Sequence, residues 1–303
     1  MNIIDSHSHL WLRQDTVVDG QPIKTLHDGR SLFFGEEVQM LPPWLIDGRN
    51  SAEVFLSNMN YAQVGAAVVV QEIIDGQQND YLLTVQQQYP DRFFCMGMPE
   101  FRFGNDYLGE AASLIARGFR GLAIPGHRLT DIPLNSPRMM QLFEEMERCD
   151  VVLSICLADD ERQIAEMAEA IQQCPRLRVA IGHFGLVTTS NWRKQILLAR
   201  ESENVRVESG GITWLYNSEF YPYPSAVRSI REAADMVGMD RLMWGSDYPR
   251  TITAITYRMS YDFISKSSEL SETDKALFLG ENAKQFYGFG PLPELPYIKN
   301  MSE

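Results

Sequence analysis

Eight short apolar runs, separated by longer stretches with helical spacing, constrain the fold of this 303-residue chain more than any other feature. The runs span residues 2–5, 66–71, 93–98, 121–124, 151–156, 178–181, 205–208 and 241–244. Near-continuous apolar runs are typical of parallel strands that helices cover on both faces. Between the runs, apolar residues recur three and four apart, for example in 139–146 and 162–171, which indicates amphipathic helices.

This alternation places the chain in the α/β class and predicts a (β/α)8 TIM barrel, a fold that usually takes about 250 residues. No linker or internal repeat divides the sequence, so we expect one domain over residues 1–303. An open doubly wound sheet has the same alternation. However, no G-x-G-x-x-G motif follows the first run, which argues against a dinucleotide-binding sheet.

Two segments fall outside the alternation. Residues 12–50 form a long loop after the first predicted strand, and a loop at that place usually overhangs the active face of a barrel. The alternative is a surface excursion without a chemical role. The C-terminal tail, 290–303, contains Pro291, Pro293 and Pro296 and cannot be helical throughout. We expect it to wrap the surface or a neighbouring subunit, which leaves a homo-oligomer open. Before the tail, Ser271 can cap a last helix that runs to about Tyr287.

The composition argues against several classes of function. The chain has 27 Lys and Arg against 40 Asp and Glu, and a net charge of -13 repels nucleic-acid phosphates and anionic lipid headgroups. No apolar run is long enough to span a membrane, and the N-terminus has no signal-peptide pattern. The four cysteines form no C-x-x-C pair, which is typical of reduced thiols. We therefore expect a cytoplasmic protein that acts on a small molecule and binds neither nucleic acid nor membrane.

The strongest chemical signal is the sequence Asp5-Ser6-His7-Ser8-His9 at the end of the first run. Side chains two apart on a strand point to the same side, so His7 and His9 should project together into the top of a barrel. Two neutral imidazoles in that geometry can share one small cation. Two histidines packed in the core are the alternative, but the chain has only five histidines and two of them fall here.

Two further candidates follow later runs. His183 comes directly after the sixth run between two glycines, and Asp247 follows the eighth run in the sequence Gly-Ser-Asp-Tyr-Pro. The carboxyl ends of the strands carry the catalytic groups of a TIM barrel. The alternatives are a core histidine bonded to the backbone and an aspartate that caps a helix. A buried aspartate is costly unless a cation or hydrogen bonds hold it.

Taken together, the H-x-H motif, the later Gly-His and the closing Gly-Ser-Asp-Tyr-Pro resemble the amidohydrolase superfamily. More narrowly they resemble its amidohydrolase 2 branch, over residues 5 to about 289. That branch holds sugar-lactone and pyrone-dicarboxylate lactonases and metal-dependent non-oxidative decarboxylases. The resemblance implies His7, His9, His183 and Asp247 as ligands of one divalent metal ion, zinc first, or as substrate contacts in metal-free lactonases. It also implies that His183 polarises the substrate carbonyl and that Asp247 takes the proton of the attacking water.

This chain departs from the pattern of the branch at two places. Members with two metal ions have a lysine after the fourth strand, where this chain reads Ala-Ile-Pro-Gly-His up to His127. Many members with one metal ion have a histidine at the end of the fifth strand, and the run 151–156 has none. A binuclear site is therefore not expected, and the lactonases are favoured over the decarboxylases.

Candidate substrate-binding groups lie near other predicted strand ends and in the long loop: Glu72, Arg120, His127, Glu208, Arg250 and Trp11. Arginine grips carboxylates bidentately, and aromatic side chains, including Trp44 and Trp214, suit a sugar ring. Each alone has a structural alternative as a cap, an ion pair or a packing residue. The sequence thus predicts a hydrolase that opens a lactone or similar cyclic ester of a sugar acid or carboxylated substrate. The alternatives are a metal-dependent non-oxidative decarboxylase of an aromatic or unsaturated acid, and a non-catalytic barrel that binds a small molecule.

Overall fold

The computed structural model of the protein describes residues 2–101, 104–129, 131–299 and 301. Eight of its strands are paired in parallel and overlap the eight predicted runs, which confirms the parallel α/β class. They are β1 (Ile4–Ser8), β6 (Ala66–Val69), β7 (Phe93–Cys95), β8 (Gly121–Ile124), β9 (Val152–Ile155), β10 (Val179–Ile181), β11 (Val205–Glu208) and β12 (Leu242–Met243).

The parallel strands form two sheets in chain order, β1-β6-β7 and β8-β9-β10-β11-β12. Single parallel bridges link the two sheets at both edges. Gly97 pairs with Leu122 between β7 and β8, and Ser8 pairs with Tyr248 between β1 and the segment after β12. At the second edge the backbone N–H of Ser6 also donates to the carbonyl of Trp244 at 2.9 Å. The first and last parallel strands are therefore neighbours in space.

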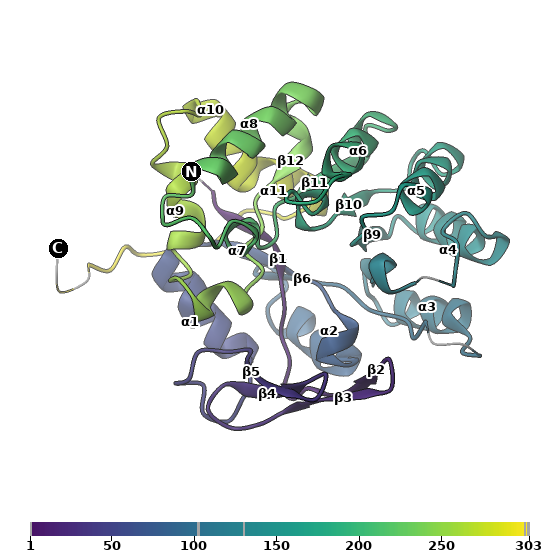
Figure 1. Ribbon diagram of the computed structural model, residues 1–303, viewed down its shortest axis with the longest axis horizontal. Helices are drawn as coiled ribbons and strands as arrows, with labels where there is room; N and C mark the ends of the chain where they lie inside the picture. Colours follow the sequence, from purple (N-terminus) through teal and green to yellow (C-terminus); the bar gives the residue numbers. More distant parts are fainter. Residues whose placement is uncertain (1, 102–103, 130, 300, 302–303) are drawn as a thin grey trace.

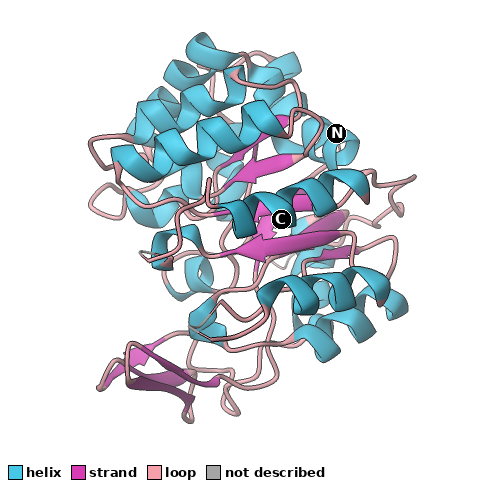
Figure 2. Ribbon diagram, turned by 90° about the vertical axis from the view of Figure 1, so that its right-hand side faces the viewer, coloured by secondary structure: helices cyan, strands magenta, loops and turns pink. Residues whose placement is uncertain are grey.

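The helices lie outside the parallel strands (Figures 1 and 2). They are α1 (Ala52–Ala62), α2 (Asn79–Gln88), α3 (Tyr107–Ala116), α4 (Pro137–Arg148), α5 (Glu161–Gln173), α6 (Trp192–Leu197), α7 (Ile212–Leu215), α8 (Pro224–Val237), α9 (Met259–Ser265), α10 (Glu272–Ala276) and α11 (Asn282–Tyr287). In α4, Ser136 caps the first turn, Pro137 occupies a position that needs no N–H, and one face buries Leu142, Phe143 and Met146. None of the helices among the described residues is long and apolar enough to cross a bilayer.

The inner faces of the parallel strands enclose a small apolar core of alternating residues such as Val68, Phe94, Met96 and Val152. Phe286, Tyr287 and Phe289 pack against this core from α11 and the residues that follow it. Apolar side chains therefore fill the amino end of the parallel strands. Any substrate is expected at the opposite end, where the strands have their carboxyl ends.

The segment 12–50 is not the loop that we expected. It contains an antiparallel sheet of four strands, β2 (Asp15–Val18), β3 (Gln21–Thr25), β4 (Arg30–Phe33) and β5 (Glu36–Gln39), which stands at one end of the molecule in Figure 2. Two-residue turns close the outer hairpins. Asp19-Gly20 and Phe34-Gly35 have positive φ at both positions, as a type I′ turn requires. The prediction that this segment overhangs the active face agrees with its contacts, because β2 and the short helix after β6 pack together.

The end of the chain follows the sequence prediction. Ser271 accepts a hydrogen bond from the N–H of Asp274, and the helical path continues from α10 through one π turn into α11, where Gly288 ends it with φ 71°. The described part of the tail is not helical and lies on its own chain: Leu292 packs beside Gly65, and Pro296 accepts a hydrogen bond from Gln63. Residues 300, 302 and 303 of the predicted tail lie outside the described residues.

Candidate functional site

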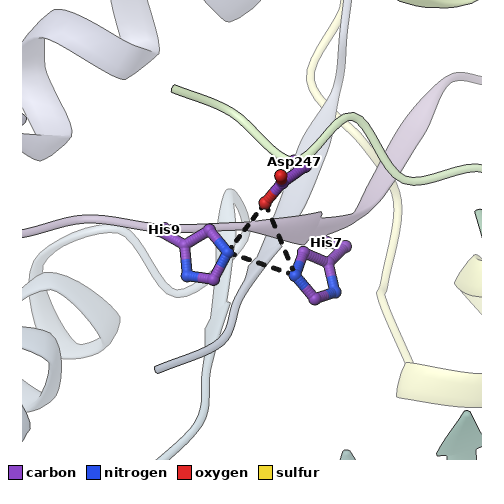
Figure 3. Close-up of side chains that lie close together, drawn as sticks. All are labelled: His7, His9 and Asp247. Carbon is purple, nitrogen blue, oxygen red and sulfur yellow. Dashed lines mark hydrogen bonds and ion pairs between the residues drawn. The ribbon is translucent and has the colours of Figure 1, made fainter. Parts of the chain in front are cut away.

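Three side chains from the two ends of the chain converge at the carboxyl end of β1. His7 lies within β1, His9 follows it directly, and Asp247 lies in the segment after β12 (Figure 3). The Nε2 atoms of His7 and His9 are 3.1 Å apart. The Oδ1 atom of Asp247 lies 2.9 Å from Nε2 of His9 and 3.8 Å from Nε2 of His7. Each of the three residues is 1% exposed, so they form one compact, buried polar cluster.

Local backbone geometry aims Asp247 at the histidines. Its N–H donates to the carbonyl of His7 at 2.9 Å, and its φ of 57° lies in the left-handed region, which aspartate tolerates better than most residues. His183, the other predicted catalytic residue, has φ 52°. Residues held in this region tend to lie at functional sites, because the surrounding structure must impose the conformation.

A carboxylate faces the outer nitrogen of each histidine in the cluster. Oε1 of Glu208 lies 2.8 Å from Nδ1 of His7, and Oδ2 of Asp75 lies 3.3 Å from Nδ1 of His9. An ionised carboxylate can only accept hydrogen bonds, so both contacts favour the tautomer with the proton on Nδ1. When both rings are neutral, the two Nε2 lone pairs then point at each other and at Asp247. Metal-binding histidines are commonly oriented in this way.

Asp5 supports the cluster from the same face of β1. Its carboxylate accepts hydrogen bonds from the N–H and hydroxyl of Ser246, from the hydroxyl of Tyr257 and from the N–H of His7. These contacts tie β1 to the residue before Asp247. Burial raises the pKa of Asp5 to about 6, although the same hydrogen bonds act to lower it. Asp5 was not among the predicted site residues, although it lies two residues before His7 in the motif.

The charges of the cluster oppose the cost of burial. Burial by itself lowers the pKa of His7, but Glu208, Asp247 and Asp5 together outweigh it and raise that pKa to about 9. Burial and the charge of Arg250 instead lower the pKa of His9 to about 4. For Asp247, burial is outweighed by its contact with His9 and by the charge of Arg250, which hold its pKa well below the usual range. Asp247 therefore stays ionised beside the two imidazoles.

The donor set fits one divalent cation. Two imidazole nitrogens only 3.1 Å apart repel each other unless a proton or a cation lies near both. Together with a carboxylate oxygen they offer the nitrogen and oxygen ligands that zinc and similar ions prefer. Within the described part of the chain, His7, His9 and Asp247 form a group whose ligand atoms all lie within 4.8 Å of one another. His183 is not a member of that group.

Comparison with known proteins identifies the family of this chain. Residues 4–289 match the family model Amidohydro_2, described as amidohydrolase. The chain belongs to the amidohydrolase 2 family. The L-fucono-1,5-lactonase of Burkholderia ambifaria is 27% identical over 258 residues, which cover 81% of this chain and 80% of that protein.

Solved structures share the fold of this amidohydrolase. A protein of Acinetobacter baumannii described as a "probable 2-pyrone-4,6-dicarboxylic acid hydrolase", with citric acid bound, has a TM-score of 0.68 and 19% identity, covering 95% of this chain and 100% of that one. An amidohydrolase of Burkholderia multivorans with bound zinc has a TM-score of 0.67 and 17% identity, covering 97% and 100%. Decarboxylases that act on 5-carboxyvanillate and 2,6-dihydroxybenzoate have the same fold.

His183 lies beside the cluster of this amidohydrolase. The centre of its ring is 4.5 Å from that of His7, and its Nδ1 lies 2.9 Å from the carbonyl oxygen of Gly210. Because that carbonyl can only accept, Nδ1 carries the proton and Nε2 presents a lone pair. Burial and the neighbouring His7 lower the pKa of His183, which keeps the ring neutral. A neutral ring of this tautomer accepts a hydrogen bond at Nε2 and cannot polarise a carbonyl by donating one.

Trp214 and Arg250 hold the carboxylate of Asp247. The indole N–H of Trp214 donates to Oδ2 at 2.7 Å, while Nη1 of Arg250 lies 3.4 Å from Oδ1. Arg250 also donates from Nη2 to Asp75 at 3.0 Å. Arg250 was predicted to bind substrate, but here it is paired with two carboxylates of the site. The contact of Trp214 with Asp247 was missed, because no sequence pattern relates residues 33 positions apart.

Three further residues that we predicted to contact substrate are Glu208, Arg120 and Trp11, and all three have partners within the protein. Glu208 is 1% exposed and directs its oxygens to His7, to the N–H of His183 and to the N–H of Gly210, so it positions the site. Arg120 precedes β8 and stacks on the ring of Phe94 at the amino end of the strands, opposite the cluster. Trp11 is fully buried, and its indole N–H donates to the carbonyl of Gly48 in the inserted segment. Arg120 is therefore too far away to contact a substrate at the cluster, whereas substrate contact by Glu208 and Trp11 stays a prediction.

A cavity of about 410 Å³ lies between the inserted sheet and the carboxyl ends of β6, β7 and β8. Its walls include residues 15–19 of β2 and its turn, Ile73 after β6, residues 98–101 after β7, and Arg128 and Leu129 after β8. Glu72 and His127, the two remaining predicted substrate contacts, are the chain neighbours of Ile73 and Arg128. The inserted sheet thus supplies one wall of a space that is large enough for a small substrate.

Proposed function

We propose that this amidohydrolase opens a lactone or similar cyclic ester of a sugar acid or carboxylated substrate, with Asp247 as the base. The convergence of two imidazole nitrogens and one carboxylate oxygen after the first and last parallel strands carries the proposal. The similarity to an L-fucono-1,5-lactonase supports it. We propose further that the parallel strands close into one (β/α)8 barrel domain over residues 1–303, in which the carboxyl ends of the strands hold the site.

His7, His9 and Asp247 would hold one divalent metal ion, zinc being the first choice for nitrogen and oxygen ligands. When bound, such an ion supplies a Lewis acid that polarises an ester carbonyl and acidifies water. Asp247 needs that help, because a carboxylate whose pKa is held well below the usual range is a weak base on its own. A lactone carbonyl is also more electrophilic than an amide, which suits a site with a weak base.

The side chains of the site have separate roles in activating the attacking water and in holding the site geometry. Asp247 accepts the proton of the attacking water, while Trp214 and Arg250 keep its carboxylate in place. His183 has a free Nε2 lone pair and orients the water by accepting its second hydrogen. Glu208 holds the imidazole of His7 by a hydrogen bond at Nδ1, and the carboxylate of Asp75 faces Nδ1 of His9 at 3.3 Å.

A decarboxylase is the second candidate, favoured by the solved decarboxylases of the same fold. One experiment separates the candidates. Purified protein is analysed for bound metal and offered aldonolactones, with acid release followed by a pH indicator, and carboxylated phenols, with carbon dioxide release followed in parallel. Acid from lactones supports the proposal, and carbon dioxide alone contradicts it in favour of decarboxylation. A compound that binds and is recovered unaltered, with neither product formed, supports a non-catalytic binding protein.

A further inference from the structure

A second pair of polar side chains, Glu72 and His127, follows the carboxyl ends of β6 and β8. Glu72 precedes the short helix Ile73–Asp75 after β6, and His127 lies in the short helix Gly126–Arg128 after β8. Oε1 of Glu72 and Nε2 of His127 are 3.9 Å apart, which is too long for a direct hydrogen bond. Glu72 is 8% exposed, and Nδ1 of His127 is buried without a hydrogen-bond partner in the described structure.

The pair has neighbours on the cavity wall and in the histidine cluster. On the cavity side, Ile73 and Arg128, the chain neighbours of the pair, line the 410 Å³ space. On the cluster side, the charges that act on Glu72 belong to Arg250, Asp75 and His7, with Arg128 on the cavity side. His127 feels the charges of Arg128 and His183, and the thiol of Cys156 lies near Glu72 as well. Glu72 therefore adjoins the cavity wall through Ile73 and feels the charges of the cluster.

Near neutral pH Glu72 is partly protonated and His127 is uncharged. Burial raises the pKa of Glu72 to about 7 and Asp75 adds to this, although Arg250, Arg128 and His7 oppose it. Burial lowers the pKa of His127 to about 4. A carboxylic acid with a pKa near the working pH is suited to proton donation, because it is protonated for part of the time and gives up its proton easily.

We propose that Glu72 is a second catalytic residue, the acid that protonates the leaving oxygen of the lactone. This inference rests on the proposed lactonase function. Attack and departure occur at different atoms of the substrate, and an acid distinct from Asp247 serves the second of them. Asp247 already accepts a hydrogen bond from Trp214 and faces Nε2 of His9.

The protons and electrons of the reaction balance. The water oxygen forms a bond to the carbonyl carbon, and its proton passes to Asp247. The bond between the carbonyl carbon and the ring oxygen breaks, its electron pair stays on the ring oxygen, and that oxygen takes the proton of Glu72. Asp247 then loses its proton to solvent and Glu72 regains one. The result is one hydroxy acid for each lactone and water consumed.

The test compares two leaving groups. An aldonolactone releases an aliphatic alkoxide, which needs a proton, whereas dihydrocoumarin releases a phenolate, which leaves without one. The Glu72→Gln variant should lose about 10²-fold in kcat on the aldonolactone and little on dihydrocoumarin, because only the first reaction depends on the acid. KM should change little on either substrate. The control is Glu232→Gln on α8, an exposed glutamate paired with Arg193, which should leave both rates unchanged.

The possible outcomes separate the role of Glu72 from the lactonase function itself. Equal losses on both substrates, or an unchanged rate on the aldonolactone, overturn the role of Glu72 while the lactonase function stands. A wild-type protein that opens neither lactone overturns the lactonase function and this inference with it. If Glu72→Gln does not fold, as shown by circular dichroism, Glu72→Asp replaces it, since the shorter side chain keeps the acid. A partial loss confined to the aldonolactone then supports the proposal, and equal losses contradict it.

Discussion

The indole N–H of Trp214 donates a hydrogen bond of 2.7 Å to Oδ2 of Asp247, while Oδ1 of the same carboxylate faces His9 at 2.9 Å. Trp214 lies in α7, directly after the glycines that end β11, and 40% of its surface is exposed. Trp214 therefore reaches from the rim of the site to its centre. Because its indole binds Oδ2, Oδ1 is the oxygen of Asp247 that faces the histidines.

Removing this hydrogen bond should reduce the rate without unfolding the protein. A hydrogen bond to a charged group contributes about 1.5–3 kcal/mol, so Trp214→Phe should lower kcat by roughly 10- to 100-fold if the bond matters fully in the transition state. The half-exposed ring adds little to the core, and the melting temperature should change little. Steady-state kinetics and thermal unfolding of the variant measure both. A wild-type rate would show that the carboxylate does not need the indole.

Asp247→Asn should reduce turnover by about 10²-fold or more, because an amide cannot take the proton of the attacking water. Asparagine has nearly the same shape and tolerates the left-handed φ of 57° at this position, so the fold should stay intact. Circular dichroism and the rate on an active lactone test the two parts. An active Asp247→Asn variant would remove Asp247 from the role of base.

The contact between Glu208 and His7 should control metal binding. Glu208→Gln leaves the volume unchanged but loses the charge that orients Nδ1 of His7, and changes of this kind usually weaken metal binding about 10- to 100-fold. Competition with a chelator for added zinc gives the affinity, independently of activity. Glu203→Gln, just before the same strand, is the matched control and should bind zinc like the wild type. Equal affinities for all three proteins would contradict the role given to Glu208.

Glu72 should make the metal-free protein less stable as the pH rises. Its pKa is 4.5 in a model peptide and about 7 in the folded chain, so between these pH values the folded state holds a proton that the unfolded state releases. The stabilisation by this bound proton is complete below pH 4.5 and disappears as the pH rises through about 7. It amounts to about 3 kcal/mol, from 1.36 kcal/mol for each pKa unit.

Denaturant unfolding of wild type and Glu72→Gln across this pH range isolates the effect of Glu72. Asp5, whose pKa is also raised by burial, acts in the same direction in both proteins and cancels in the difference. The wild type should lose its advantage over the variant as the pH increases. A difference that stays constant with pH would show that Glu72 titrates normally.

The positions of the strands and the pairing of His7 with His9 followed from the sequence because both depend on local periodicity. A buried parallel strand is apolar throughout, and residues two apart share a face wherever the strand lies. Asp247 could be added because a barrel was expected, in which the last strand lies beside the first. The observed contacts between β1 and the segment after β12 bring residues 240 positions apart together without any local signal.

The inserted sheet could have been recognised from Asp19-Gly20, a dipeptide typical of two-residue hairpins. Its strands alternate weakly, because β2 and β5 are largely exposed and bury few apolar side chains. Arg120 was misplaced for another reason: it precedes β8, and only residues that follow a strand lie at its carboxyl end. Asp75 and Gln14, which are hydrogen-bonded at 2.9 Å beside His9, meet only through tertiary structure.

The most direct measurement is the anomalous scattering of a crystal of the protein grown with equimolar zinc and measured at the zinc absorption edge. The account predicts one peak that lies about 2.0–2.2 Å from Nε2 of His7, Nε2 of His9 and an oxygen of Asp247. A crystal without a peak at this position, or with its zinc bound elsewhere on the chain, would contradict the assignment of these three residues as a metal centre.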